Sequence, residues 1–224
     1  MYNKVKLTKR QIKEDKFMAF MLTSKQQVTD NWQFVVIGAI VLILVLVGAV
    51  YYSNSQALKA AEGVARYDQA VSEYRSGSNQ VALLNFSQIV EEHSGELIAE
   101  RSTLMMGKIN YELRNYSEAI RFFEMYLSSY SGDLLNRSVA YAGIAGSHEN
   151  NGEYQQAGEK FIVAYQENID GPLAGDYLVA AVRNYLEAGN TAGASDQIDI
   201  LEEKFTGTIP AIAARRLFSE KTGG

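Results

Sequence analysis

Turn-forming residues recur at a nearly constant interval after residue 53, and this repeat limits the possible folds more than any other feature. Two series of turns alternate along the chain. The segments between them are about 13 to 20 residues long, with apolar residues at helical spacing. One series consists of Gly77, Asn115, Gly152 and Gly189, and the other of Gly95, Gly132, Gly171 and Gly207. Two interleaved series at one period predict a repeated helix–turn–helix unit.

The two prolines of the chain agree with this division. Pro172 directly follows Gly171, and Pro210 comes shortly after Gly207. Proline fits the first turn of a helix but breaks a helix interior. Both prolines therefore predict the start of a new helix.

The residues inside each unit carry a second periodic pattern. Four alanines step by 37, 38 and 37 residues: Ala82, Ala119, Ala157 and Ala194. In the second unit Gly107 stands twelve positions before its alanine and Phe123 four positions after it, and the third unit repeats this with Ala145 and Phe161. The pattern resembles the tetratricopeptide repeat. The fourth unit matches less well, since Ile198 stands where an aromatic residue is usual, and the first unit is weaker still.

This resemblance implies an all-α fold, an α-solenoid of about four helix hairpins. Gly107 and Ala119 would lie where the two helices of a hairpin cross, and Phe123 and Phe161 would fill the space between hairpins. The family period is about 34 residues, so three or four additional residues per unit are expected between hairpins or as an added helical turn. Residues 209–221 predict a last, capping helix. A helical bundle without repeats is the alternative.

Residues 34–52 form a run of nineteen residues without a charge. A helix of that length spans roughly 28 Å, close to the hydrocarbon thickness of a bilayer. Trp32 and the pair Tyr51 and Tyr52 flank the run, where aromatic rings prefer the headgroup layers. The run therefore predicts a single transmembrane helix. A cleaved signal peptide, the competing interpretation, would have a shorter apolar core and a small-residue cleavage site, which is not found after Tyr52.

Charge predicts the orientation of this helix. Residues 1–33 hold seven of the 21 basic residues and three of the 26 acidic ones. The positive-inside rule places that end in the cytoplasm and the acidic remainder outside it. We expect a bacterial inner-membrane, single-pass protein with a basic cytoplasmic segment (1–33), a transmembrane helix (34–52) and a periplasmic repeat domain (53–224). The acidic domain argues against nucleic acid as a partner.

The basic segment itself contains a predicted helix. Thr8 and Gln11 fit a capping box, and the helix would run from Lys9 to about Thr29. Its apolar residues share one face: Phe17, Phe20, Met21 and Val28. That face would lie on the inner membrane surface or dock to another membrane protein. Disorder is a third interpretation.

Residues suited to catalysis or metal binding are scarce. The chain has no cysteine, and neither His93 nor His148 has a second ligand at metal-binding spacing. The adjacent acids Glu91 and Glu92 point in different directions on a helix, so they are not a catalytic pair. Phosphate-binding loops and nucleophile elbows are missing from the sequence. We therefore expect no enzyme activity, cofactor, metal site or small-molecule substrate.

A solenoid of this type offers a groove lined by the first helix of each hairpin. Tyrosine-rich surfaces suit polypeptide recognition, because tyrosine supplies contact area at low entropic cost. The predicted partner-binding residues are Tyr67, Tyr74, Leu104, Lys108, Tyr111, Glu149 and Arg183, with Val179 and Leu186 beside them. The competing interpretation is that several of them simply pack between first helices.

The complete layout carries a second resemblance. A basic segment, one span beginning shortly after Asn31 and Trp32, and an acidic repeat domain resemble the YfgM-type ancillary subunit of the bacterial Sec translocon. That resemblance implies a chaperone-like adaptor at the outer face of the inner membrane. Its partners would be translocon subunits, a membrane-anchored prolyl isomerase-like protein or an emerging polypeptide. The alternative is a structural scaffold or accessory subunit of another cell-envelope complex.

Overall fold

The computed structural model describes residues 16, 18, 20 and 32–223, and the chain divides after Ala60 into two compact units. The helix predicted from Lys9 to Thr29 falls, apart from three single positions, outside the described residues. Its two proposed roles therefore stay predictions.

The first long element is α2 (Trp32–Arg75), a helix of 44 residues that contains the whole apolar run. Its most apolar window has a mean hydropathy of 3.0, and none of that window is buried. A core helix of a water-soluble protein would be covered by other elements. By length and composition α2 can cross a membrane, although a signal sequence has the same properties.

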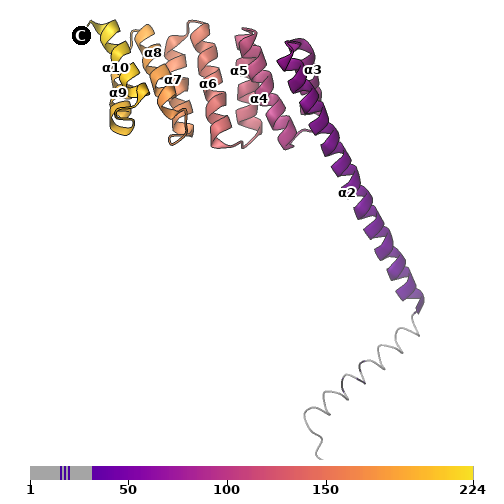
Figure 1. The fold of residues 1–224 in the computed structure, drawn as a ribbon. Coiled ribbons are helices and arrows are strands. Elements are labelled where there is room, and N and C mark those ends of the chain that lie inside the picture. Colours follow the sequence, from indigo (N-terminus) through magenta and orange to yellow (C-terminus); the bar gives the residue numbers. More distant parts are fainter. Residues whose placement is uncertain (1–15, 17, 19, 21–31, 224) are drawn as a thin grey trace, which may run out of the picture. The chain divides into compact units, whose positions relative to one another are not determined.

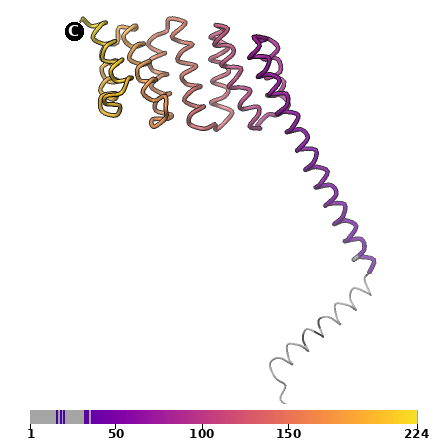
Figure 2. Tube along the Cα trace, in the orientation of Figure 1, coloured from indigo at the N-terminus to yellow at the C-terminus, as the bar shows by residue number. Residues whose placement is uncertain are grey.

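The second unit begins at Ala61 and consists of helices joined by short turns (Figures 1 and 2). Residues 61–75 of α2 pair with α3, and three further hairpins and one last helix follow. Their bounds are α3 (Asn79–Glu92), α4 (Leu97–Glu112), α5 (Tyr116–Ser129), α6 (Leu134–Asn150), α7 (Tyr154–Glu167), α8 (Ala174–Glu187), α9 (Thr191–Lys204) and α10 (Ile209–Thr222). The prediction of four hairpins and a final helix is confirmed.

Left-handed backbone marks most of the predicted turns. The turn glycines Gly77, Gly95, Gly132, Gly152, Gly189 and Gly207 have φ between 52° and 84°, a region that favours glycine. Two positions differ. Gly171 is not left-handed, and between α4 and α5 the left-handed residue is Arg114, with φ 61°, while Asn115 caps α5. No glycine marks this turn, which is why the sequence pointed to its neighbour.

One of the two prolines starts a helix as predicted, and the other does not. Pro210 lies in the first turn of α10, as predicted. Pro172 lies in the turn itself, two residues ahead of Ala174, where α8 begins. It precedes the helix and does not form its first turn.

The predicted small residues lie where the helices approach most closely. The crossing alanines Ala82, Ala119, Ala157 and Ala194 are fully buried. A Cβ added to Gly107 of α4 would come within 2.7 Å of the Phe123 ring, and one added to Gly143 of α6 would overlap the other side of that ring. The ring of Phe123 therefore joins two successive hairpins. Phe161, at the corresponding position of the next hairpin, is buried in the apolar cluster shared by α6, α7 and α8.

Candidate functional site

Two hollows open between the first helices of the second unit. The central hollow has a volume of about 570 Å³ and lies among α4, α6 and α8. The N-terminal hollow, of about 630 Å³, lies between residues 67–75 of α2 and α4. Met105 and Lys108 line both hollows, so the two adjoin and form one groove.

All seven predicted partner-binding residues line this groove. The central hollow contains five of them: Leu104, Lys108, Tyr111, Glu149 and Arg183. The N-terminal hollow contains Tyr67 and Tyr74, together with Lys108. Val179 and Leu186 instead pack against the apolar cluster around α8 and line neither hollow.

An ion pair crosses the central hollow. The Arg183 guanidinium on α8 donates to both carboxylate oxygens of Glu149 on α6, at 2.9 Å each. Two parallel hydrogen bonds between a guanidinium and a carboxylate restrain the orientation of both groups more than a single bond does. Because both side chains are partly exposed, the pair adds at most about 1 kcal/mol to stability. Glu149 and Arg183 thus connect neighbouring hairpins, as the competing interpretation proposed.

A second polar link lies in the N-terminal hollow. The Tyr74 hydroxyl donates to the Glu112 carboxylate at 2.7 Å, and the Lys108 ammonium lies 5.5 Å from the centre of the Tyr74 ring. Burial, followed by the hydrogen bond and the charge of Glu112, raises the pKa of Tyr74 to about 12. Tyr74 therefore stays a neutral donor at any physiological pH.

Two predicted tyrosines have packing contacts. The Tyr111 hydroxyl accepts from the Asn150 amide at 3.1 Å, and its ring meets Tyr116 edge-on. Tyr67 meets Phe86 edge-on at 5.5 Å, and burial raises its pKa. Both rings stabilise the stack, and each also presents part of its surface to the groove.

Lys108 and Leu104 differ from those residues. Lys108 is exposed and its described contact is the Tyr74 ring, and Leu104 is half-buried in the wall of the central hollow. Within the described part of the chain, no hydrogen bond ties either side chain to another first helix. They are the predicted residues most available to a ligand.

The sequence did not single out Val139, Leu173 and Asp176, which also line the central hollow and are exposed. Val139 and Asp176 are 37 residues apart, one repeat length, and stand in corresponding first helices. They stand three residues before Ala142 and Val179, the positions equivalent to Leu104, so projecting the predicted groove positions through the repeats would not have found them.

Among the described residues, no group of three or more His, Asp and Glu side chains could hold a metal ion. His93 is buried with its ring 3.2 Å from the Glu96 carboxylate, and His148 contacts Glu153. Each histidine is therefore engaged by one carboxylate. Contacts of this kind can orient a helix end. Among the described residues that line the groove, no hydroxyl side chain stands beside a histidine base.

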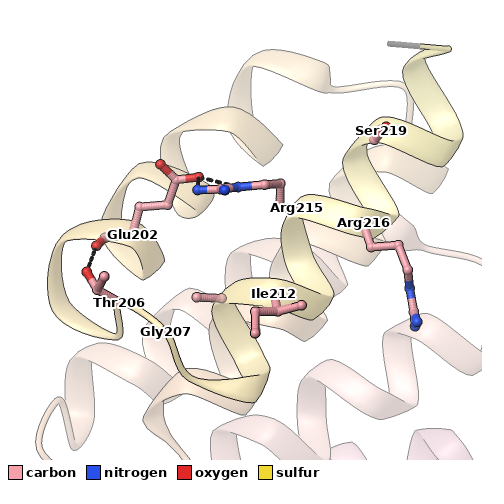
Figure 3. A pocket seen from close by; sticks show the side chains of 8 residues that line it. Glu202, Thr206, Gly207, Ile212, Arg215, Arg216 and Ser219 are labelled. Atoms are coloured by element: carbon pink, nitrogen blue, oxygen red, sulfur yellow. Dashed lines mark hydrogen bonds and ion pairs between the residues drawn. The ribbon is translucent and has the colours of Figure 1, made fainter.

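A third hollow, of about 630 Å³, lies between α9 and α10 (Figure 3). The Arg215 guanidinium donates to Glu202 across it, with a shortest distance of 2.6 Å, and Ile212 is exposed beside it. Arg216 reaches toward the opposite side of the helix in this view. None of the predicted binding residues lies here.

Comparison with known proteins identifies the repeats. A family model described as a tetratricopeptide repeat-like domain matches residues 25–168, which is more than half of the chain. None of the curated proteins compared with the chain matches it.

Three solved structures share the fold. A tetratricopeptide repeat protein from Parabacteroides merdae ATCC 43184 is 14% identical, with a TM-score of 0.60 over 72% of this chain and 60% of that one. Repeats of a putative kinesin light chain from Podosopora anserina, described as nearly identical TPR-like repeats, are 14% identical, with a TM-score of 0.54 over 71% and 86%. A point variant of the same Podosopora repeats gives 0.53 over 71% and 85%, at 14% identity. The chain thus spans about three fifths of the length of the Parabacteroides protein, and identity this low shows only a shared fold.

Proposed function

The chain belongs to the tetratricopeptide repeat-like domain family, and we propose that it is a membrane-anchored adaptor that holds a protein segment in the groove of its first helices. The observation that carries this proposal is the convergence of seven predicted residues from four successive repeats on two adjoining hollows. Solenoids of helix pairs serve as extended binding surfaces for proteins. The walls of the central hollow are largely aliphatic and aromatic, with Lys108, Glu149, Asp176 and Arg183 as its charged residues.

The anchor is the apolar part of α2, and the repeats lie on the extracytoplasmic side of a bacterial inner membrane. Two features support this placement. The apolar window of α2 is uncovered by protein, and basic residues concentrate ahead of it while acidic residues predominate after it. The lipid bilayer is then the first partner of the chain.

The proposed protein partners are Sec translocon subunits, a periplasmic chaperone, or a polypeptide that emerges from the channel. Support comes from the order of parts: a basic segment, one apolar helix and an acidic tetratricopeptide repeat unit. An emerging chain would present apolar side chains to the aliphatic and aromatic wall of the central hollow. We propose no catalytic role.

Photocrosslinking tests this function. A benzophenone amino acid replaces Leu104 in the wall of the central hollow, and the matched control carries it at Gln156, an exposed residue of α7 that lines neither hollow. In native membranes the first variant should crosslink to Sec channel subunits or nascent secreted chains, and the control should not. Crosslinks at Leu104 to subunits of a different envelope complex would favour the scaffold alternative. Equal crosslinking at both positions would contradict a binding groove.

A further inference from the structure

The basic residues of the second unit differ in whether they have a carboxylate partner. The unit is acidic overall, with 13 basic and 23 acidic residues from Ala61 onward. Seven of the basic side chains form ion pairs with acidic ones. Within the residues that the structure describes, the other six form none, and three of these six surround the N-terminal hollow: Arg75, Arg101 and Lys108. Half of the unpaired cations therefore gather at one hollow.

The charges around the N-terminal hollow are mostly positive. Arg75 at the end of α2 and Lys108 on α4 line it, and both are exposed. Burial raises the pKa of Tyr67 in this hollow, and the positive charge of Arg101 opposes that rise, so Arg101 lies close by. Asp68 is the acidic residue among those that line the hollow. Three cations against one lining carboxylate attract an acidic side chain.

The neighbours of Lys108 leave it available to a ligand. The Glu112 carboxylate, one helical turn further on, accepts the Tyr74 hydroxyl with both oxygens, at 2.7 and 2.8 Å. The Lys108 ammonium lies 5.5 Å from the centre of the Tyr74 ring, and such a contact leaves N–H donors free. Even with Glu112 counted, cations outnumber acids around the N-terminal hollow.

The far end of the groove carries the opposite charge. Glu149 and Arg183 of the central hollow bond to each other, so their charges compensate. Asp176 lies in the first turn of α8 and is exposed, and no described basic residue pairs with it. Figure 1 shows α4, α6 and α8 in this order along the repeats. Lys108 on α4 and Asp176 on α8 therefore stand at opposite borders of the central hollow.

Between these two charges the central hollow is apolar. Leu104, Val139 and Leu173 line it with aliphatic side chains, and Val139 and Leu173 are exposed. On α6, Gly143 and Gly146 carry no side chain that could fill the volume of about 570 Å³. A large aliphatic or aromatic side chain of a ligand would lose water contact on entering this space.

We propose that the groove selects a partner segment with an acidic residue at one end, a large aliphatic or aromatic residue in its middle and a basic residue at the other end. This inference rests on the proposed adaptor function and names the chemistry of the partner. The acidic end pairs with Arg75 and Lys108, the apolar residue enters the central hollow, and the basic end pairs with Asp176. At about 10 Å per step between packed helices, α4 and α8 lie roughly 20 Å apart, which about six extended residues span.

The order of charges along the segment, and not its net charge, then sets the specificity. Charged pairs at the rim of an interface add little affinity, but they exclude partners that bring the wrong charge. Net charge alone makes the opposite prediction. A chain with a formal charge of −5 attracts a wholly basic segment most strongly.

Titration with synthetic peptides tests the inference on the full-length protein in mild detergent. Three fluorescent peptides share a leucine–tryptophan centre and carry glutamates at one end and lysines at the other, glutamates at both ends, or lysines at both ends. A fourth has unlike ends and a serine centre. At low salt the peptide with unlike ends and the apolar centre should bind about tenfold more tightly than the lysine-ended one, and this ratio should shrink as salt is added. The serine centre should also cost about tenfold.

Charge variants assign each end of the peptide to its border of the groove. Lys108→Glu should erase the preference for unlike ends over lysine ends. Asp176→Asn should erase the preference for unlike ends over glutamate ends. Lys160→Glu on α7 makes the same charge change outside both hollows and should keep the wild-type order.

The contrary outcomes are distinct. Tightest binding of the lysine-ended peptide would show that net charge governs binding and would overturn this inference. An unchanged order in Lys108→Glu would assign the preference to another part of the chain, such as the basic residues before position 34, and would overturn it too. A dimer in light scattering that no peptide dissociates would mean that a second copy occupies the groove, with the same consequence.

The photocrosslinking experiment separates this inference from the proposed function. If benzophenone at position 104 crosslinks to a partner while the peptides bind without regard to charge, or not at all, this inference fails and the adaptor groove stands. Absence of both peptide binding and crosslinking at Leu104 would contradict both.

Discussion

The Phe123 ring of α5 fills the space left by the missing side chain of Gly143 on α6. A Cβ at position 143 would overlap the ring, and Gly107 of α4 approaches the same ring from within its own hairpin. One aromatic side chain therefore holds two hairpins at a fixed separation, and both glycines are required by the close approach.

Gly143→Ala should destabilise the repeat unit by about 1–3 kcal/mol, since the added methyl overpacks the contact. Alanine raises helix propensity by up to about 1 kcal/mol, so a net loss would identify the steric cause. Urea unfolding of the solubilised chain measures the change. In the double variant Gly143→Ala, Phe123→Leu the two losses should be less than additive; strict additivity would show that the residues do not interact.

The left-handed turn at Arg114 predicts an unusual stabilising substitution. Arg114→Gly should raise the free energy of unfolding by about 0.5 kcal/mol, because glycine adopts positive φ without the Cβ penalty. Gly152→Ala, at an equivalent turn with open space around it, should lower it by about 1 kcal/mol. Thermal or urea unfolding compares the two. Destabilisation by Arg114→Gly would contradict the assignment of this turn.

Alkaline pH should weaken the contact between Tyr74 of α2 and Glu112 of α4. The folded pKa of Tyr74 is about 12 against an ordinary value of 10.0, because burial and Glu112 disfavour the phenolate. The stabilisation from the neutral phenol is therefore complete below pH 10 and is lost as the pH rises from 10 towards 12. Tyr74→Phe should flatten this part of the stability profile, which urea unfolding at successive pH values measures. Identical profiles for wild type and Tyr74→Phe would exclude this linkage.

A charge reversal at Lys108 tests whether the partner binds in the groove. It lines both hollows and is exposed, so Lys108→Glu should reduce partner binding roughly tenfold while the melting temperature stays near that of wild type. Lys160→Glu on α7, which lines neither hollow, is the control. Titration with a purified partner measures the affinity of each variant. Equal affinity of both variants would place the partner elsewhere on the surface.

Most of the fold could be predicted from the sequence, since glycine turns and crossing alanines report local constraints on the backbone. Arg114 was missed because a left-handed arginine leaves no trace in composition. Tyr111 and Glu149 both line the groove and bond to a neighbouring hairpin, and this combination was harder to predict. Their partners Asn150 and Arg183 lie 39 and 34 residues away, so these contacts appear only when successive repeats are placed side by side.

The charge pattern predicts on which side of the proposed membrane the repeats lie, and the proposed partners depend on that side. Cysteine labelling of intact cells measures it most directly, with the full-length variants Thr8→Cys and Asn151→Cys and a membrane-impermeant maleimide. We expect that Asn151→Cys is labelled once the outer barrier is opened and that Thr8→Cys is labelled only after the inner membrane is lysed. Labelling of Thr8→Cys before lysis, with Asn151→Cys protected, would contradict it.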